Sequence, residues 1–174
     1  MIKGITFDEQ TVTAENMAHL MKAFSGNVSG ITRGCEITSD ANNMYISEGY
    51  MLIQGREIQV IGTHSVALNK VTAGEQYCRV VYEIDLSKSN TSDAFNQGAI
   101  KTLTLSSGYP TLTQQDLEDN PTGVYQFLLA QYHTSPSGID SFTAKASSID
   151  TSWMNEEAFK KHFSLKGTDL YITL

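Results

Sequence analysis

The sequence predicts a mainly β protein of the α+β class, an antiparallel β-sandwich or meander with two or three short helices. Apolar residues recur at every second position over most of residues 33–105, which is the period of half-buried strands. Gly, Asn, Asp and Ser divide that pattern into short segments, as expected where strands follow one another through tight turns. Helical patterns are confined to about residues 13–25, 113–118 and 155–163.

The first expected elements are a short strand over residues 2–8 and the helix over residues 13–25. Thr13 is a good helix N-cap, and Gly26 is a good stop. Met and Phe recur along one side of this helix at helical spacing, which predicts a face packed on the core; a groove for a partner is the alternative. That face consists of Met17, Leu20, Met21 and Phe24.

An antiparallel meander is expected between residues 33 and 68, and its clearest part is the hairpin at residues 46–61. Two runs of strand-forming residues meet there at Gly55. Glycine takes a positive φ without steric penalty, so we expect Gly55 to occupy the tight turn. This signature is structural and carries no catalytic group.

Further strands and two short helices are expected in the second half of the chain. The strands cover residues 77–86, 100–105, 124–133 and 170–174, and a polar loop covers residues 87–98. Thr113 to Asp116 fits a helix-start pattern and predicts the helix over residues 113–118. Glu and Lys at spacings of four support the helix over residues 155–163, and the basic run at residues 160–162 is expected to be a solvated face of it.

Length and charge limit the possible classes of protein. The 174 residues fit a single domain over residues 1–174, or two sub-lobes at 1–75 and 76–174. A net charge of −7 argues against binding to nucleic acid, which requires a basic surface. No apolar run is long enough for a membrane-spanning helix or for the apolar part of a signal peptide, so we expect neither segment. We therefore expect the protein to be made in the cytoplasm without insertion into a membrane.

The reactive side chains show no spacing typical of a metal or catalytic site. Cys35 and Cys78 lie in strand-like contexts outside any CxxC pattern, so we expect free core residues, and a disulfide between them stays open. The four histidines, His19, His64, His133 and His162, lack metal-site spacing.

The acidic residues Asp116, Glu118 and Asp119 lack the spacing of a calcium loop and are expected to form a capped surface turn. Like the histidines and cysteines, these acidic residues therefore have a structural explanation. The sequence therefore predicts no enzyme activity, no cofactor, and no catalytic, cofactor-binding or metal-binding residue.

Three segments carry motifs that follow one another along the chain. The first is Gly4-Ile-Thr-Phe-Asp8 followed by Val12-Thr-Ala-Glu-Asn-Met17. The second is Gly30-Ile-Thr-Arg-Gly-Cys-Glu-Ile-Thr38 followed by Met44-Tyr-Ile-Ser-Glu-Gly-Tyr-Met-Leu-Ile-Gln-Gly-Arg-Glu-Ile-Gln-Val60. The third is Tyr109-Pro-Thr-Leu-Thr-Gln-Gln-Asp-Leu117 followed by Gly123-Val-Tyr-Gln-Phe-Leu-Leu-Ala-Gln-Tyr132. In this order the three segments resemble the tail and baseplate structural proteins of long-tailed phages and prophages of Gram-positive bacteria.

The resemblance implies a structural component of a phage tail or baseplate that resides in the virion tail and acts by assembly. It implies homo-oligomers, often trimers, with other tail or baseplate proteins as partners. Its motifs consist of turns, caps and core positions, so no functional residue is transferred from the family.

The alternative is a receptor- or carbohydrate-binding module of the same tail apparatus, with a host cell-surface saccharide as its ligand. A solvent-facing cluster of Tyr45, Tyr50, Tyr109 or Trp153 would support it, because saccharide sites favour exposed aromatic rings. We expect these rings to pack in the core or in a subunit interface instead. A cell-wall hydrolase ranks last.

Overall fold

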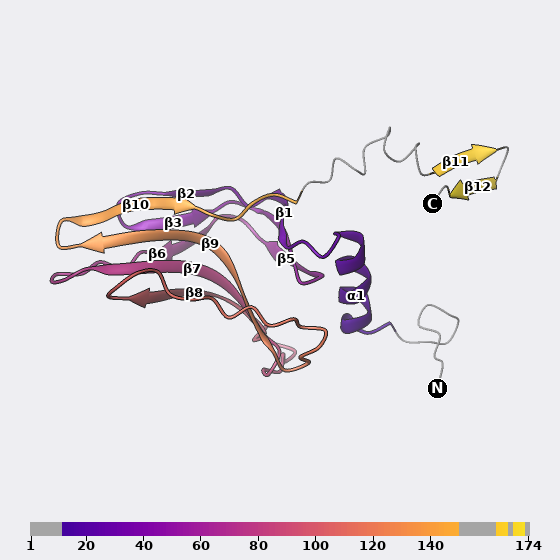
Figure 1. Cartoon of the computed structure of the whole chain (residues 1–174), viewed down its shortest axis with the longest axis horizontal. Helices are drawn as coiled ribbons and strands as arrows, with labels where there is room; N and C mark the ends of the chain where they lie inside the picture. The colour runs from indigo at the N-terminus through magenta and orange to yellow at the C-terminus, as the bar shows by residue number, and fades with distance from the viewer. Residues whose placement is uncertain (1–11, 150–162, 167–168, 173–174) are drawn as a thin grey trace.

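The computed structural model describes residues 12–149, 163–166 and 169–172 of the chain. Over these residues the protein is mainly β, and its antiparallel sheets pack in a sandwich-like arrangement. The strands run side by side along the molecule, and α1 (Ala14–Phe24) lies beside one end of them (Figure 1). The predicted fold class is confirmed.

Twelve strands follow α1 in the described part of the chain. The first six are β1 (Gly30–Gly34), β2 (Ile37–Ser39), β3 (Asn43–Ile46), β4 (Gly49–Ile53), β5 (Arg56–Val60) and β6 (His64–Ala67). The next four are β7 (Gln76–Asp85), β8 (Gly98–Leu105), β9 (Val124–Ser135) and β10 (Gly138–Ala144). The last two, β11 (Phe163–Lys166) and β12 (Asp169–Ile172), pair with each other.

The first six strands form one antiparallel meander that is bent in the middle. β2, β3 and β6 pair in that order in one half, and β1, β4 and β5 pair in that order in the other. Hydrogen bonds from Cys35 N to Glu48 O (3.2 Å) and from Ser47 N to Glu36 O (3.0 Å) continue the pairing across the bend. The meander predicted between residues 33 and 68 is therefore confirmed.

The turn between β4 and β5 has two residues, Gln54 and Gly55, because Ile53 pairs directly with Arg56. Both turn residues have a positive φ, 50° at Gln54 and 73° at Gly55. Two successive positive φ angles define the type I′ turn that suits the twist of a hairpin. The conformation predicted for Gly55 is confirmed.

The second layer is a four-stranded antiparallel sheet in the order β10-β9-β7-β8. The strands and the polar loop predicted over residues 77–105 agree with β7, β8 and the connection between them, and residues 124–133 agree with β9. The sequence did not predict β10. Its ladder to β9 is interrupted between Asp140 and Thr143, and Ser141 there has a φ of 55°.

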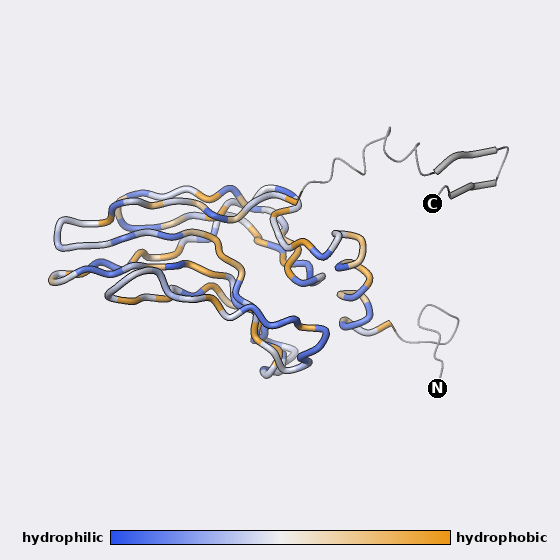
Figure 2. The backbone as a smooth tube through the Cα atoms, in the orientation of Figure 1, coloured by the Kyte–Doolittle hydropathy of each residue, from blue (hydrophilic) through white to orange (hydrophobic). Residues whose placement is uncertain are grey.

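The meander and the second sheet bury their facing sides in one core. The meander contributes fully buried apolar side chains, among them Met44, Ile46, Met51 and Ile53. The second sheet contributes Val80, Leu129, Ala130 and Tyr132 in the same way. In Figure 2 hydrophobic residues recur along the strands of both layers, between hydrophilic ones.

One side of the sandwich is closed by the chain that follows β10. Lys145 N donates to Leu129 O of β9 (2.8 Å), which keeps this chain beside the second sheet. Two residues later the chain has reached β1, where Ile31 N donates to Ser147 O (2.9 Å) and Ile149 N donates to Ile31 O (2.8 Å). On the other side, β5, β6 and β8 are edge strands in the described residues, so this side is open.

α1 begins and ends close to the predicted positions. Thr13 Oγ1 accepts a hydrogen bond from Asn16 N (3.1 Å), as an N-cap does. After Phe24 the chain leaves the helix through Gly26 and Asn27, whose φ angles are 63° and 64°. The helix predicted over residues 13–25 is confirmed.

The predicted packing of the Met and Phe side chains of α1 on the core is wrong. Ala18 and Lys22 are the buried positions of the helix, whereas Phe24 is 58% exposed. The helix backbone at Ala18 lies so close to Gly55 that this side of the helix faces the sandwich. The more apolar side is left exposed, and Figure 2 shows hydrophobic residues along α1, away from the sheets.

The helix predicted over residues 113–118 is also wrong. Thr113 N donates to Gln126 Oε1 (2.9 Å), and Gln126 N donates to Thr113 O (2.7 Å). These bonds hold the beginning of the segment along β9, so the helix-start pattern does not close on itself. A turn remains, in which Asn120 N donates to Asp116 O (3.1 Å).

Two predicted elements lie wholly or largely outside the described residues. They are the strand over residues 2–8 and the helix over residues 155–163, of which Phe163 begins β11. The strand predicted over residues 170–174 agrees with β12 as far as Ile172.

Candidate functional site

A polar cluster attaches α1 to the loop before β9. Lys22 Nζ lies 2.9 and 2.8 Å from the two carboxylate oxygens of Asp116 and 2.8 Å from Glu118 Oε2. His19 Nδ1 contacts the other oxygen of Glu118. We call Lys22, Asp116, Glu118 and His19 the polar cluster.

The polar cluster is electrostatically matched. Lys22 is 6% exposed, and burial alone would lower its pKa, but its hydrogen bonds to Asp116 and Glu118 raise the pKa above the usual value. The hydrogen bond from Lys22 in turn lowers the pKa of both carboxyl groups. The cluster therefore holds α1 on the loop before β9 by a charged contact.

A second contact fixes α1 on the β4–β5 turn. A Cβ added to Gly55 would lie 1.8 Å from Ala18 O and 3.0 Å from the Cβ of Lys22. Such an approach is open only to glycine. The polar cluster and this turn together determine which side of α1 faces the sandwich.

The opposite side of α1 is an exposed apolar surface. It comprises Met17, Leu20 and Phe24 of the helix, with Val12 just before the N-cap and Val28 shortly after the helix ends. These five residues are 43–58% exposed, and we call them the helix face. Beside it, Phe24, Val28 and Ile149 line an open hollow of about 680 Å³. Exposed apolar side chains gathered on one anchored helix are typical of an interaction surface.

The histidines other than His19 lie away from the polar cluster where the structure describes them. His133 Nδ1 is 2.8 Å from Asp140 Oδ1, and Nε2 is 3.4 Å from Glu75 Oε2. The hydrogen bond with Asp140 raises the pKa of His133 in spite of the opposing effect of burial. His64 begins β6 on the open side of the sandwich, and His162 lies outside the described residues.

The two cysteines are buried and free. Burial raises the pKa of both thiols, and the Cys78 thiol contacts the Tyr132 hydroxyl in the core. The Tyr132 hydroxyl also accepts a hydrogen bond from Asn69 N (2.8 Å). The prediction of free core residues is confirmed for Cys35 and Cys78. In the described ranges, no three His, Cys, Asp or Glu side chains gather as a metal site would require.

The tyrosines considered for saccharide binding have separate partners. Tyr45 donates to Asp40 Oδ2 (2.7 Å), and the Tyr50 hydroxyl accepts from Gln59 Nε2 (3.0 Å). Tyr109 packs edge-on against Tyr77 with 5.4 Å between ring centroids, and the Arg79 guanidinium lies 5.6 Å from the Tyr109 ring. Trp153 lies outside the described residues.

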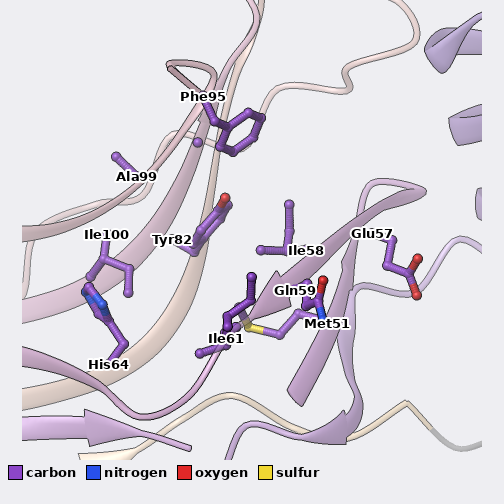
Figure 3. Close-up of a pocket in the computed structure, with 12 residues that line it drawn as sticks. Met51, Glu57, Ile58, Gln59, Ile61, His64, Tyr82, Phe95, Ala99 and Ile100 are labelled. Atoms are coloured by element: carbon purple, nitrogen blue, oxygen red, sulfur yellow. The ribbon is translucent and has the colours of Figure 1, made fainter. Parts of the chain in front are cut away.

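The open side of the sandwich contains a groove of about 420 Å³ between the β5 and β8 edges. Its walls are mostly apolar, and its lining includes Met51, Ile58, Ile61, Tyr82, Phe95 and Ile100 (Figure 3). Ile61 and Phe95 are 84% and 61% exposed. Glu57, Gln59 and His64 add polar groups to the lining. Its size falls in the range of ligand sites in proteins, about 300–1,000 Å³.

Tyr82 is a mostly buried tyrosine whose side chain lines this groove. It is 8% exposed, and burial raises its pKa to about 12. A Cβ added to Gly98 would lie 2.1 Å from the Tyr82 hydroxyl and 2.6 Å from the Phe95 ring, so a glycine is required beneath the two rings. Within the described part of the chain the hydroxyl makes no hydrogen bond, and it points into the groove (Figure 3).

Glu83, next to Tyr82 on β7, is a buried acid whose two carboxylate oxygens both have hydrogen-bond partners. Glu83 is 7% exposed; it accepts a hydrogen bond from Gln126 Nε2 (2.8 Å) and contacts the Lys101 ammonium. Burial would raise the pKa of Glu83, but these two hydrogen bonds lower it. Glu83 therefore has a structural role as a paired carboxylate.

Sequence reasoning missed the polar cluster, the exposure of the helix face and the groove. The cluster joins residues 94 to 96 positions apart, which no local pattern reveals. For the groove, Ile61 before Gly62 and Phe95 within a polar loop were weak signals, since both are apolar residues in turn-rich sequence.

The chain matches no model of a protein family, and no curated protein matches its sequence. A separate structural finding concerns membranes: among the described residues, no helix combines the length and the apolar character needed to cross a bilayer.

Proposed function

We propose that this chain is a structural component of a phage or prophage tail or baseplate and acts by assembly. The motifs over residues 2–135 support the choice of particle. The observation that carries the mode of action is the helix face, an apolar surface on a helix that two independent contacts hold in place.

Leaving the apolar helix face in contact with water costs free energy, which a partner recovers when it covers this surface. Burial of apolar area stabilises a complex by about 25 cal/mol per Å². A helix held on a rigid sandwich loses little conformational freedom when a partner covers it, so more of this free energy remains for association. The expected partners are further copies of the chain, with a trimer as the proposed form, and other tail or baseplate proteins.

The proposal includes no catalysis. The buried or clustered charged groups already pair with each other: Lys22 with Asp116 and Glu118, Lys101 with Glu83, and His133 with Asp140 and Glu75. Such pairs stabilise a rigid scaffold. The polar cluster lines an open hollow of about 390 Å³, but Lys22 engages both of its carboxylates and His19 contacts Glu118.

The test is made in a prophage that carries the gene. Deletion should abolish complete tails, and Leu20→Glu combined with Phe24→Glu should do the same while the purified variant keeps the wild-type melting temperature. Leu105→Glu, at an exposed apolar residue outside the helix face and outside the hollow beside it, is the matched control and should leave tails intact. Normal tails without the gene would overturn the proposal.

A receptor- or saccharide-binding module is the second candidate. The exposed Phe95 ring at the groove favours it, because an exposed aromatic ring beside polar groups suits a sugar. Particles with Phe95→Ser should then assemble normally and fail to adsorb to host cells. Normal adsorption of these particles would exclude this role for the groove.

A further inference from the structure

We infer that the groove on the open side of the sandwich binds the β11–β12 hairpin of a second copy of the chain, which adds to the free edge of β8. This rests on the proposed function in one respect: assembly from repeated copies brings a second hairpin to the groove.

The groove lies between two strands whose outer edges are unpaired in the described residues. β8 is the outer strand of the order β10-β9-β7-β8, and β5 is the outer strand of the order β1-β4-β5. An edge strand presents a row of unpaired N–H and C=O groups that can pair with a further strand. The opposite side of the sandwich, by contrast, is closed by hydrogen bonds at Ile31.

The chemistry of the groove also suits a strand with apolar side chains. Its lining is mostly apolar and includes Ile58, Ile61 and Ile100. The Tyr82 hydroxyl points into this groove and makes no hydrogen bond with the described residues. A strand that lies in the groove can offer this hydroxyl a carbonyl oxygen as a hydrogen-bond acceptor.

The β11–β12 hairpin has the pattern of a segment that needs a surface to pack on. Its register pairs apolar with apolar residues, Phe163 with Ile172 and Leu165 with Leu170. An isolated two-stranded hairpin is marginally stable in water and requires a third strand or a surface to pack on. β11 and β12 pair only with each other among the described residues, so each has an edge to offer.

Charge is complementary as well. The hairpin contains Lys166 and Asp169, which are partners in its register, so the basic run at residues 160–162 before it supplies the positive charge. The groove lining includes the exposed carboxylate of Glu57, in a chain of net charge −7. Opposite charges at the rim of an interface favour encounter and orientation.

The hairpin belongs to a second copy because of where its connection starts. Ile149, the last described residue before it, is bound to Ile31 on the closed side of the sandwich. A hairpin that filled its own groove would have to pass around the sandwich to the open side. A neighbouring copy accepts it without that detour.

The experiment uses the full-length chain with Leu165→Asp and Leu170→Asp as the receptor, which removes the apolar pairing of its own hairpin. The probe is a labelled synthetic peptide of residues 160–174. Fluorescence anisotropy should show saturable binding, and hydrogen exchange of alternate β8 amides should slow when the peptide is bound.

Two further changes in this receptor locate the site. Ile61→Asp should weaken peptide binding at least about tenfold, because it places a charge in the apolar groove. Ile61 is 84% exposed, so this change should not unfold the protein. Leu105→Asp, at the other end of β8 and outside the groove, is the matched control and should change binding less than about twofold.

Mixing the two variants tests whether the hairpin binds the groove of its own chain or that of a second copy. Light scattering should show that a mixture of the Ile61→Asp chain and the hairpin-defective chain forms an assembly larger than either chain forms alone, because association through the helix face is open to both chains before mixing. Monomeric wild-type protein whose β8 amides are already protected would overturn the inference in favour of the chain's own hairpin.

Absence of peptide binding, or binding that Ile61→Asp does not weaken, would also overturn the inference, as would Ile61-dependent binding of a saccharide alone. These results are distinct from a failure of the proposed function. Normal tails after gene deletion would leave peptide binding unaffected, and absence of peptide binding would leave the deletion result unaffected.

Discussion

Replacement of Gly55 by alanine tests how α1 is held on the sandwich. The added Cβ would lie 1.8 Å from Ala18 O, against 3.4 Å for the start of ordinary contact, so the turn and the helix must separate by about 1.6 Å. The residue must also keep a φ of 73°, which is unfavourable for any side chain with a Cβ.

The cost follows from these two effects. The left-handed conformation contributes about 1–2 kcal/mol for a residue other than glycine. Inserting an atom into a packed site costs about 1–3 kcal/mol. We therefore expect Gly55→Ala to lower the free energy of unfolding by about 2–5 kcal/mol.

Urea unfolding with matched controls separates the two effects. Gly74 and Gly108 have φ angles of 70° and 71°, and an added Cβ would meet nothing within 4 Å at either position. Gly74→Ala and Gly108→Ala should therefore cost only the conformational part, about 1–2 kcal/mol. If Gly55→Ala costs no more than these controls, the helix does not rest on the turn and the reasoning is refuted.

Three further predictions concern titratable groups. The hydrogen bond with Asp140 raises the pKa of His133, so its contribution to stability is complete below the unfolded pKa of about 6.5 and is lost as pH rises through the folded pKa. The urea midpoint should fall more over this range in the wild type than in His133→Gln, and equal falls would contradict this. Lys22→Met leaves the carboxylates of the polar cluster without their cation and should accelerate amide exchange in α1; unchanged exchange would show that the cluster does not anchor the helix. Burial raises the pKa of the Cys35 and Cys78 thiols, so both should react with an aromatic disulfide reagent only as fast as the chain unfolds, and immediate reaction of either would contradict their burial.

Sequence patterns were sufficient to predict elements that residues close together in the sequence determine. The β4–β5 hairpin could be predicted because alternation and one glycine determine it within a few residues. The limits of α1 could be predicted because Thr13 supplies a cap at short range. The orientation of α1 could not, because contacts with Gly55 and Asp116 decide it and both are distant in sequence.

Local patterns failed where a distant segment competes for the same backbone. The helix-start pattern at Thr113 is real, but two hydrogen bonds with Gln126 hold Thr113 beside β9 instead. The groove has no linear signature, because its lining comes from β4 to β8 and from the loops before β6 and β8. The hydroxyl of Tyr82 becomes a candidate ligand group only when those elements are assembled.

The closure of the sandwich at Ile31 has a consequence for the order of folding. Ile31 forms a bridge with Ser148, 117 residues further along the chain. The six strands of the meander can pair through short turns as soon as they are synthesised, but the segment that covers the edge of β1 emerges much later. Contacts between such distant residues slow folding. We therefore expect the apolar side of the meander to stay accessible to chaperones during synthesis, until the chain beyond β10 has left the ribosome.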